Sequence, residues 1–275
     1  AYNLLGQRIA VAILVIVAVH KWPSATALAA AYCLGTVLGV IAMFVSAARI
    51  GLLPRPSLVT REGMRNMWRR SHAVGFAGVL GTLTFRSDTV LLGWLSTLTA
   101  TGVYAAGYRL FESSLFLLYA LVRVSTPKMS ASRDKSALLR LVSLTPTIAL
   151  CAFIPYVAVL VARGGDVMTL VFGSQYGGVD SKLTMALLGL SLVPYAIQFL
   201  SQSALISRKF NRSVLIGAIV VLVVNVGFNV AFIPPWGPVG AAAGTLVAML
   251  VAWGYLRWRV GREIGPAPLW PWVWP

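Results

Sequence analysis

Long apolar runs dominate the hydropathy pattern of this chain, and shorter polar or basic connections separate them. A bilayer core of about 30 Å needs roughly 20 mostly apolar residues per helix. The runs do not alternate with the two-residue period of a barrel strand, so the pattern predicts helices. The eight predicted spans are Leu4–Val19, Ala25–Ala47, Ala73–Leu95, Gly102–Val124, Leu141–Val161, Leu183–Ile206, Ser213–Phe232 and Val239–Leu256.

The composition favours lipid over water as the solvent for most of the chain. Hydrophobic residues make up 58 % of the 275 positions and charged residues only 11 %, and the mean hydropathy is +0.81. A soluble domain carries about 25 % charged residues, because its surface must stay hydrated. We therefore predict an all-α integral membrane protein rather than a soluble protein with buried helices.

The basic residues predict the orientation of the spans. The chain holds 23 Lys and Arg against 7 Asp and Glu, a net charge of +16, and cytoplasmic loops retain Lys and Arg. Most of these cations fall on alternate connections, namely Arg49, Arg55, Arg61, Arg65, Arg69 and Arg70, then Lys128, Arg133, Lys135 and Arg140, then Arg208, Lys209 and Arg212, then Arg257, Arg259 and Arg262. We predict a multi-pass protein with both ends in the cytoplasm. Topology accounts for charge scattered over four loops, so nucleic acid is not an expected partner.

Three segments outside the predicted spans, two connections and the tail, are long enough to have a structure of their own. Residues 48–71 form a basic linker that we expect to lie on anionic lipid headgroups. Residues 163–182 are predicted to contain a short re-entrant or interfacial helix. Residues 259–275 are predicted to be a cytoplasmic tail, either an aromatic interface anchor or disordered. Its closing tryptophans are Trp270, Trp272 and Trp274.

The third and fourth predicted spans contain ionisable residues at membrane depth. These are Arg86 and Asp88, and then Arg109 and Glu112. Each costs at least about 2.5–3.5 kcal/mol in hydrocarbon and so needs a compensating partner or water. The short connection makes the two helices antiparallel neighbours, which predicts a pairing of Asp88 with Arg109 or of Arg86 with Glu112. Two compatible interpretations stay open: a structural ion-pair network, or a water-filled cavity whose arginines attract an anionic substrate.

Four amide side chains are further candidates for the lining of such a cavity. Gln198 and Gln202 lie four residues apart in the sixth span, and Asn225 and Asn229 lie four apart in the seventh. Residues at this spacing share one face of a helix. The alternative interpretation is that these amides hydrogen-bond neighbouring helices to one another.

No catalytic or metal-binding motif accompanies the spans. Cys33 and Cys151 lie inside apolar runs without metal-ligand spacing, and His20 and His72 are isolated near span ends. The sequence shows no Ser/His/Asp set, phosphate-binding glycine loop or metal cluster. We therefore predict a protein that is not an enzyme and has no cofactor or metal site. A membrane glycosyltransferase or polysaccharide polymerase is the alternative.

Several segments, taken in order, resemble one family. They are Arg86–Gly93 (RSDTVLLG), Thr101–Leu110 (TGVYAAGYRL), Pro127–Ser130 (PKMS), Val171–Tyr176 (VFGSQY) and Pro238–Ala242 (PVGAA). Together they resemble the lipid-linked oligosaccharide flippases, the Wzx-like polysaccharide transporter branch of the multidrug/oligosaccharidyl-lipid/polysaccharide exporter superfamily. The similarity extends over most of residues 73–256.

The resemblance implies two six-helix lobes on either side of a central cavity. Residues 1–47 would then be the last two helices of the first lobe, and residues 48–71 the cytoplasmic linker between lobes. Residues 72–258 would form the complete second lobe, followed by the tail 259–275. Four preceding helices would be missing, so we expect an amino-terminally truncated fragment that does not transport alone.

The resemblance also implies a function in the bacterial inner membrane. The expected activity is translocation of undecaprenyl-diphosphate-linked oligosaccharide for capsule, O-antigen, lipopolysaccharide or exopolysaccharide synthesis, alongside the pathway's polymerase and glycosyltransferases. Arg86 and Arg109 are candidates to attract the diphosphate, because a guanidinium presents a fork of donors. Asp88 and Glu112 would hold those arginines and are candidates for proton or sodium coupling. Alternatives are a peptidoglycan lipid precursor flippase, a cation-coupled drug exporter, or a non-transporting remnant.

Overall fold

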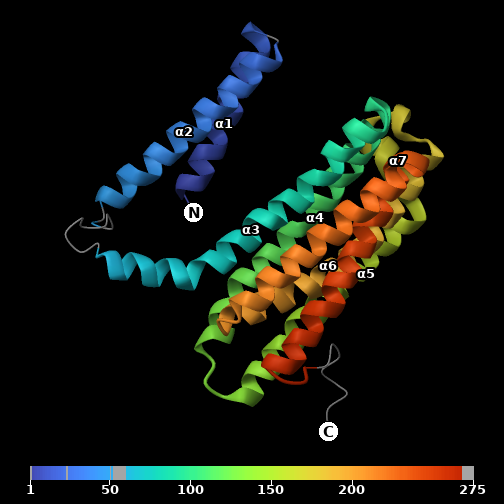
Figure 1. Ribbon diagram of the computed structural model, residues 1–275. Coiled ribbons are helices and arrows are strands. Elements are labelled where there is room, and N and C mark those ends of the chain that lie inside the picture. The colour runs from blue at the N-terminus through green and yellow to red at the C-terminus, as the bar shows by residue number, and fades with distance from the viewer. Residues whose placement is uncertain (1, 23, 50, 52–59, 268–275) are drawn as a thin grey trace. The chain divides into compact units, whose positions relative to one another are not determined.

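The computed structural model describes every residue except 1, 23, 50, 52–59 and 268–275, and none of the described residues forms a strand. The helices are α1 (Tyr2–Lys21), α2 (Ala25–Arg49), α3 (Arg61–Leu95), α4 (Leu98–Ala131), α5 (Lys135–Phe172), α6 (Val179–Ser207) and α7 (Asn211–Glu263), with a 3-10 turn, η2 (Ser174–Tyr176), between α5 and α6 (Figure 1). The chain divides into two compact units, residues 1–68 and 69–275.

In the first unit, α1 and α2 pack against each other as a helical hairpin. A Cβ atom added at Gly35 of α2 would lie 2.7 Å from Cγ2 of Val11 on α1, so this glycine permits the close approach. The Ser24 hydroxyl begins α2 by accepting a hydrogen bond from the Ala27 N–H at 3.2 Å. Large apolar side chains such as Ile13 and Phe44 are more than half exposed. Such faces suit helices surrounded by lipid or by further helices.

In the second unit, the longest helix, α7, contains two predicted spans. Its 53 residues would extend about 80 Å at 1.5 Å per residue, far more than a bilayer core requires. The backbone breaks at Gly237 (φ 51°, ψ −125°), which follows a Pro-Pro-Trp sequence. Glycine adopts this positive φ without a steric penalty. The two halves are in close contact beside the break, since a Cβ atom at Gly240 would lie 2.1 Å from the Phe232 carbonyl oxygen.

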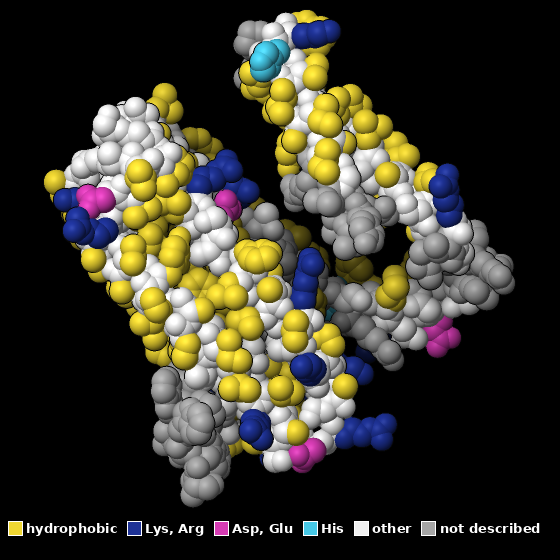
Figure 2. Space-filling model, turned by 180° about the vertical axis from the view of Figure 1, so that it is seen from behind, with side chains coloured by type: hydrophobic (Ala, Val, Ile, Leu, Met, Phe, Trp, Pro, Cys, Tyr) yellow, Lys and Arg dark blue, Asp and Glu magenta, His cyan; other side chains and the backbone are white. Residues whose placement is uncertain are grey.

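When the two halves of α7 are counted separately, each of the helices α1 to α7 in the described part of the chain contains one predicted span, eight spans in all. Five described helices, α2 and α4 to α7, are long and apolar enough to cross a membrane. In α3, Arg86 and Asp88 interrupt the apolar run, and the apolar part of α1, Ile9–Lys21, is shorter. Exposed hydrophobic side chains are spread over the surface (Figure 2). The prediction of an all-α membrane protein is confirmed.

The helices extend beyond the predicted spans at most of their ends, and at two places they include residues that were predicted as linker or tail. Residues 61–71, predicted as linker, form the first turns of α3, and the Thr60 hydroxyl accepts a hydrogen bond from the Gly63 N–H at 3.0 Å. Residues 259–263, predicted as tail, continue α7. Ile264 and Ala267 then pack in an apolar cluster with residues of α5. Pro54, Pro56 and the tryptophans of the tail lie outside the described residues.

The predicted external segment, residues 163–182, is largely helical. The backbone of α5 leaves the helical conformation at Arg163 (φ −129°) and then resumes it as far as Phe172. A Cβ atom at Gly165 would lie 2.3 Å from Cγ of Lys182, so this short helical stretch packs directly on the first turn of α6. The helix expected there is present, and its depth in the membrane stays a prediction.

A buried stripe on α4 determines which way that helix faces. The stripe consists of Tyr104, Tyr108, Phe111, Leu115 and Leu118, spaced three or four residues apart. The rings of Tyr104 and Tyr108 stack at 5.5 Å between centroids, and those of Tyr108 and Phe111 at 5.3 Å. They pack in one core cluster with residues of α5, α6 and α7. Arg109, which follows Tyr108, is consequently turned away from the core.

Candidate functional site

A buried carboxylate, Asp88, lies where α3, α4 and the two halves of α7 meet. Its side chain is 1 % exposed. The Tyr104 hydroxyl on α4 donates a hydrogen bond to Oδ2 of Asp88 at 2.5 Å, and the Thr245 hydroxyl donates to the same oxygen at 2.9 Å. Nδ2 of Asn229 donates to Oδ1 at 2.5 Å. One carboxylate therefore connects four helical segments.

Two asparagines extend this arrangement along α7. Asn225 and Asn229 are fully buried, and Oδ1 of Asn225 accepts hydrogen bonds from the Ser87 hydroxyl at 3.0 Å and from Asn229 at 3.3 Å. In the described structure, Nδ2 of Asn225 and Oδ1 of Asn229 are buried without a hydrogen-bond partner. These two atoms thus have hydrogen-bonding capacity that no described residue uses. We call the set Ser87, Asp88, Tyr104, Asn225, Asn229 and Thr245 the Asp88 cluster.

Glycine positions the second half of α7 against the first. A Cβ atom at Gly244 would lie 2.6 Å from Oδ1 of Asn229, so a larger residue would push the halves apart. The run from Gly240 to Gly244 is a small-residue face of the kind that lets helices approach closely. It brings Thr245 within hydrogen-bond distance of Asp88.

The Asp88 cluster places a carboxylate within the membrane-spanning bundle without a basic side chain paired to it. None of the three ion pairs formed by the described residues includes Asp88. Because an unpaired carboxylate is costly at this depth, a proton or a small cation is a natural partner for it. The side chains of Asp88, Tyr104 and Thr245 present oxygen atoms, which hard cations prefer as ligands. Among the described residues there is no group of three His, Cys, Asp or Glu that suits another metal.

Three charged residues lie on the other sides of α3 and α4. The Arg86 side chain is 69 % exposed, and its Nη2 lies 4.0 Å from Oε1 of Glu112. The pairing of Arg86 with Glu112 thus occurs as predicted. The pairing of Asp88 with Arg109 is not among the ion pairs of the described residues, because Asp88 is buried while Arg109 is exposed. Tyr108 occupies the inner face of α4, and the next residue points about 100° away.

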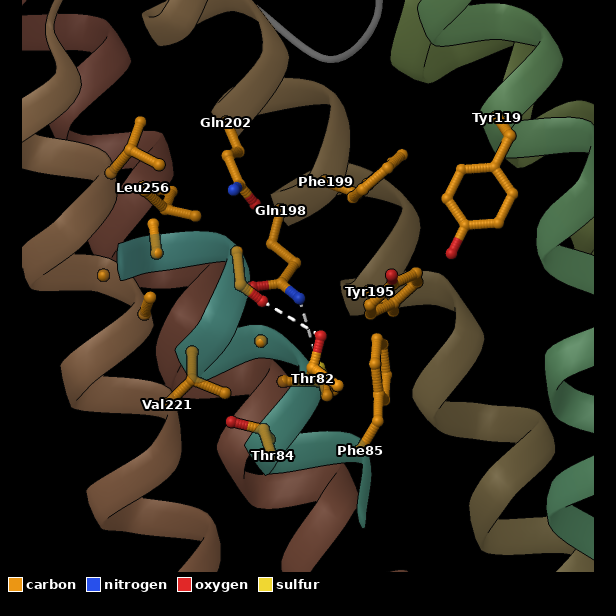
Figure 3. Close-up of a pocket in the computed structure, with 17 residues that line it drawn as sticks. Thr82, Thr84, Phe85, Tyr119, Tyr195, Gln198, Phe199, Gln202, Val221 and Leu256 are labelled. Atoms are coloured by element: carbon orange, nitrogen blue, oxygen red, sulfur yellow. Dashed lines mark hydrogen bonds between the residues drawn. The ribbon is translucent and has the colours of Figure 1, made fainter. Parts of the chain in front are cut away.

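A pocket of about 280 Å³ opens between α3, α4, α6 and α7. Gln198 and Gln202 line it together with Tyr195, and Thr84 lines it one helical turn before Asp88 (Figure 3). One of these amides already has a partner, since Nε2 of Gln198 donates a hydrogen bond to the sulfur of Met249 at 3.2 Å. The α6 amides therefore face a pocket, whereas the α7 amides belong to the Asp88 cluster. Their part in substrate binding stays a prediction.

Three members of the cluster, Ser87, Tyr104 and Thr245, have no role predicted from the sequence. Tyr104 appears only inside the TGVYAAGYRL segment. Thr245 directly follows the run of small residues from Gly240 to Gly244. This position is the sequence feature that could have identified Thr245. Its contact with Asp88 nevertheless depends on the break in α7 at Gly237, which the sequence pattern does not reveal.

A carboxylate buried among membrane-spanning helices, with exposed arginines on the same helices, is typical of a transporter. A family comparison gives the same class: the model described as lipid II flippase MurJ matches residues 8–271. The chain belongs to this family of flippases. That result supports the predicted flippase and exporter superfamily without selecting its Wzx-like branch.

One curated relative is the probable flippase AglR of Haloferax volcanii, which is 29 % identical over 172 residues. The matched region covers 59 % of this chain and 35 % of the relative. The chain thus matches little more than a third of that protein. The similarity agrees with flippase family membership, and the activity of a whole transporter belongs to the proposal below.

Proposed function

We propose that this chain forms part of a flippase that moves a polyprenyl-diphosphate-linked saccharide across the bacterial inner membrane, with both chain ends in the cytoplasm. The observation that carries the proposal is the exposure of Arg86 and Arg109 on helices of the spanning bundle. An arginine that faced hydrocarbon would cost at least about 2.5–3.5 kcal/mol. Water or another polar surface therefore covers this side of the bundle.

On this proposal, the outer face of α3 and α4 is one wall of a hydrated cavity between two lobes. Residues 72–258 form the lobe that carries this wall, and residues 1–47 end the other lobe. Arg86 and Arg109 attract the diphosphate, while Glu112 orients Arg86 across the helix pair. The polyprenyl tail stays in lipid, so only the polar head passes through the cavity.

The Asp88 cluster supplies the coupling site in this proposal, for a proton or a sodium ion. A cation bound there neutralises the carboxylate that connects α3 to α4 and α7. Loading and release therefore alter the bonds that hold α3 against the bundle. Because binding and conformation are linked reciprocally, a cation gradient can drive the alternation of the cavity between the two sides.

Two cargoes share the required chemistry. The sequence segments favour an oligosaccharide destined for surface polysaccharide, with the polymerase and glycosyltransferases of that pathway as partners. The family match favours the peptidoglycan lipid precursor. Complementation separates them: the full-length protein should restore one of two strains, either one that lacks its polysaccharide flippase or one depleted of its peptidoglycan precursor flippase.

Substitution of Arg109 tests the function itself. In the full-length protein, Arg109→Ala should abolish transport of the labelled lipid-linked saccharide while the protein stays in the membrane. Arg109→Lys should restore part of the rate, because the charge remains and the fork is lost. Arg140→Ala, on the exposed first turns of α5, is the matched control and should leave the rate unchanged. Wild-type transport by Arg109→Ala would refute the proposal.

A further inference from the structure

A second pocket lies between the first turns of the membrane-spanning part of α3 and the connection from α6 to α7. Its volume is about 880 Å³, and ligand sites typically measure about 300–1,000 Å³. Its lining residues on α3 lie about 23–29 Å from Asp88 along the helix, at 1.5 Å per residue. The lining residues are Arg69, His72, Ala73, Lys209, Asn211, Arg212 and Leu215, and none of them is acidic.

Three cations of this pocket have no acidic partner among the described residues. The three ion pairs that the described residues form, Arg86–Glu112, Arg163–Asp166 and Arg259–Glu263, do not include Arg69, Lys209 or Arg212. The neighbouring Arg208 behaves differently, because its Nη1 donates to the Ser132 carbonyl at 3.2 Å and does not line the pocket. The connection from α6 to α7 therefore uses one arginine to hold α4 and leaves two other cations at the pocket.

The backbone of the same connection adds to the positive potential. Lys209 has a left-handed backbone conformation, with φ 66°, and α7 begins two residues later without a side-chain cap at Phe210. The first turn of a helix leaves backbone N–H groups without acceptors inside the helix and carries a partial positive charge. Helix N-termini bind phosphate for this reason. Side chains and backbone thus favour the same kind of ligand, an anion.

Apolar side chains continue from the pocket along both helices. Phe76 lies four residues after His72 on α3, and Ile219 lies four residues after Leu215 on α7, so each pair shares a helix face. Phe76 and Ile219 are 51 % and 45 % exposed. A ligand with an anionic head and an apolar chain would contact both the cations and these side chains. A soluble anion would contact only the cations.

We propose that this pocket binds the phosphate group of an anionic membrane lipid, in the leaflet predicted to be cytoplasmic. Arg69, Lys209 and Arg212 donate charge-assisted hydrogen bonds to the phosphate oxygens, and the apolar chain lies along α3 and α7. Bound lipid would connect the start of α3 to the connection between α6 and α7. A bilayer phospholipid and the diphosphate of a polyprenyl carrier present the same group at this depth. The inference does not depend on the proposed transport function.

Titration of the purified full-length protein in neutral detergent tests the site. The probes are dihexanoyl phosphatidic acid, farnesyl diphosphate, dihexanoyl phosphatidylcholine and inorganic phosphate. The double variant Lys209→Gln/Arg212→Gln should weaken binding of the two anionic lipids about tenfold or more, as expected when charge-assisted hydrogen bonds are lost. The control Arg133→Gln/Arg140→Gln removes two exposed charges outside the pocket and should change the Kd by less than about twofold, as expected from long-range screening.

Each outcome of this titration has a defined meaning. Tighter binding of phosphatidic acid assigns the site to a bilayer phospholipid, and tighter binding of farnesyl diphosphate assigns it to the carrier lipid. The proposal is overturned if inorganic phosphate or phosphatidylcholine binds as tightly as the anionic lipids, or if the control weakens binding as much as the double variant. If the double variant does not elute as a folded protein, Arg212→Gln alone supplies the same comparison against Arg140→Gln.

Discussion

The inner and outer sides of α3 carry ionisable residues in opposite environments, although only two positions separate them. Asp88 is buried and accepts hydrogen bonds from three side chains. Arg86 is exposed, and its carboxylate partner, Glu112, stands at the limit of an ion pair. Residues two apart on a helix point about 200° apart. Depth in the membrane therefore does not decide the role of a charge. The side on which it lies does, because the inner side hydrogen-bonds to neighbouring helices and the outer side is exposed.

The largest expected effect comes from removing the inner charge. Asp88→Asn keeps the size of the side chain but cannot exchange a proton or balance a cation, so coupled transport by the full-length protein should be lost. The measurement is uptake of labelled lipid-linked saccharide into vesicles under an imposed sodium or proton gradient. Asp180→Asn, at the exposed start of α6, is the matched control. Transport by Asp88→Asn that still follows the gradient would exclude this carboxylate as the coupling site.

Separating the halves of α7 should damage the inner site through packing alone. Gly244→Ala places a Cβ atom 2.6 Å from Oδ1 of Asn229 and should lower the free energy of unfolding by about 1–3 kcal/mol, as overpacking does. Gly254→Ala adds the same atom where nothing lies within 4 Å, and should stabilise the helix by up to about 1 kcal/mol. Denaturant unfolding in detergent compares the two. If Gly244→Ala and Gly254→Ala had equal free energies of unfolding, the close packing of the two halves of α7 at Gly244 would not contribute to stability.

Removing one polar contact on each side of α3, a hydrogen bond on the inner side and an ion pair on the outer side, tests the comparison more finely. Tyr104→Phe takes a donor from buried Asp88 and should cost about 1–3 kcal/mol of unfolding free energy. Arg86→Gln removes an exposed pair and should change the stability by less than about 1 kcal/mol, while lowering the transport rate. Unfolding and transport are measured on the same preparations. A large loss of stability in Arg86→Gln would mean that the outer side is structural too.

Most of the fold could be predicted from the sequence, because bilayer thickness sets the length of each apolar run. The pairing of Arg86 with Glu112 could be predicted as well, since a short connection makes neighbours of α3 and α4. The divergence of Asp88 and Arg109 could not, because the direction of Arg109 follows from Tyr108 packing in the core. Thr245 was missed for a similar reason. Its place beside Asp88 depends on the backbone break at Gly237, and contacts between segments distant in the chain are not encoded in local hydropathy.

The smallest expected effect is at Asp134, a carboxylate outside the spanning segments that contrasts with Asp88. Its side chain caps α5, accepting hydrogen bonds from the Ser136 hydroxyl at 2.5 Å and the Ala137 N–H at 3.0 Å. The Ser136 hydrogen bond first, and then those from the backbone N–H groups, lower the pKa of Asp134 below the ordinary value of 3.8. The folded state then binds this proton less readily than the unfolded state does. The stabilisation is complete above the ordinary pKa and is lost as the pH falls through the lowered one.

Asp134→Asn keeps a capping oxygen but does not titrate. The wild-type protein should unfold at a slightly higher temperature than this variant at pH 7, and the difference should vanish in acid. The transport rate should stay unchanged, because Asp134 is exposed and connects no other helix. This is the reverse of Asp88→Asn, which should change transport while the protein remains folded in the membrane. A difference in unfolding temperature that widens in acid would contradict the capping role, since only a raised pKa produces that direction.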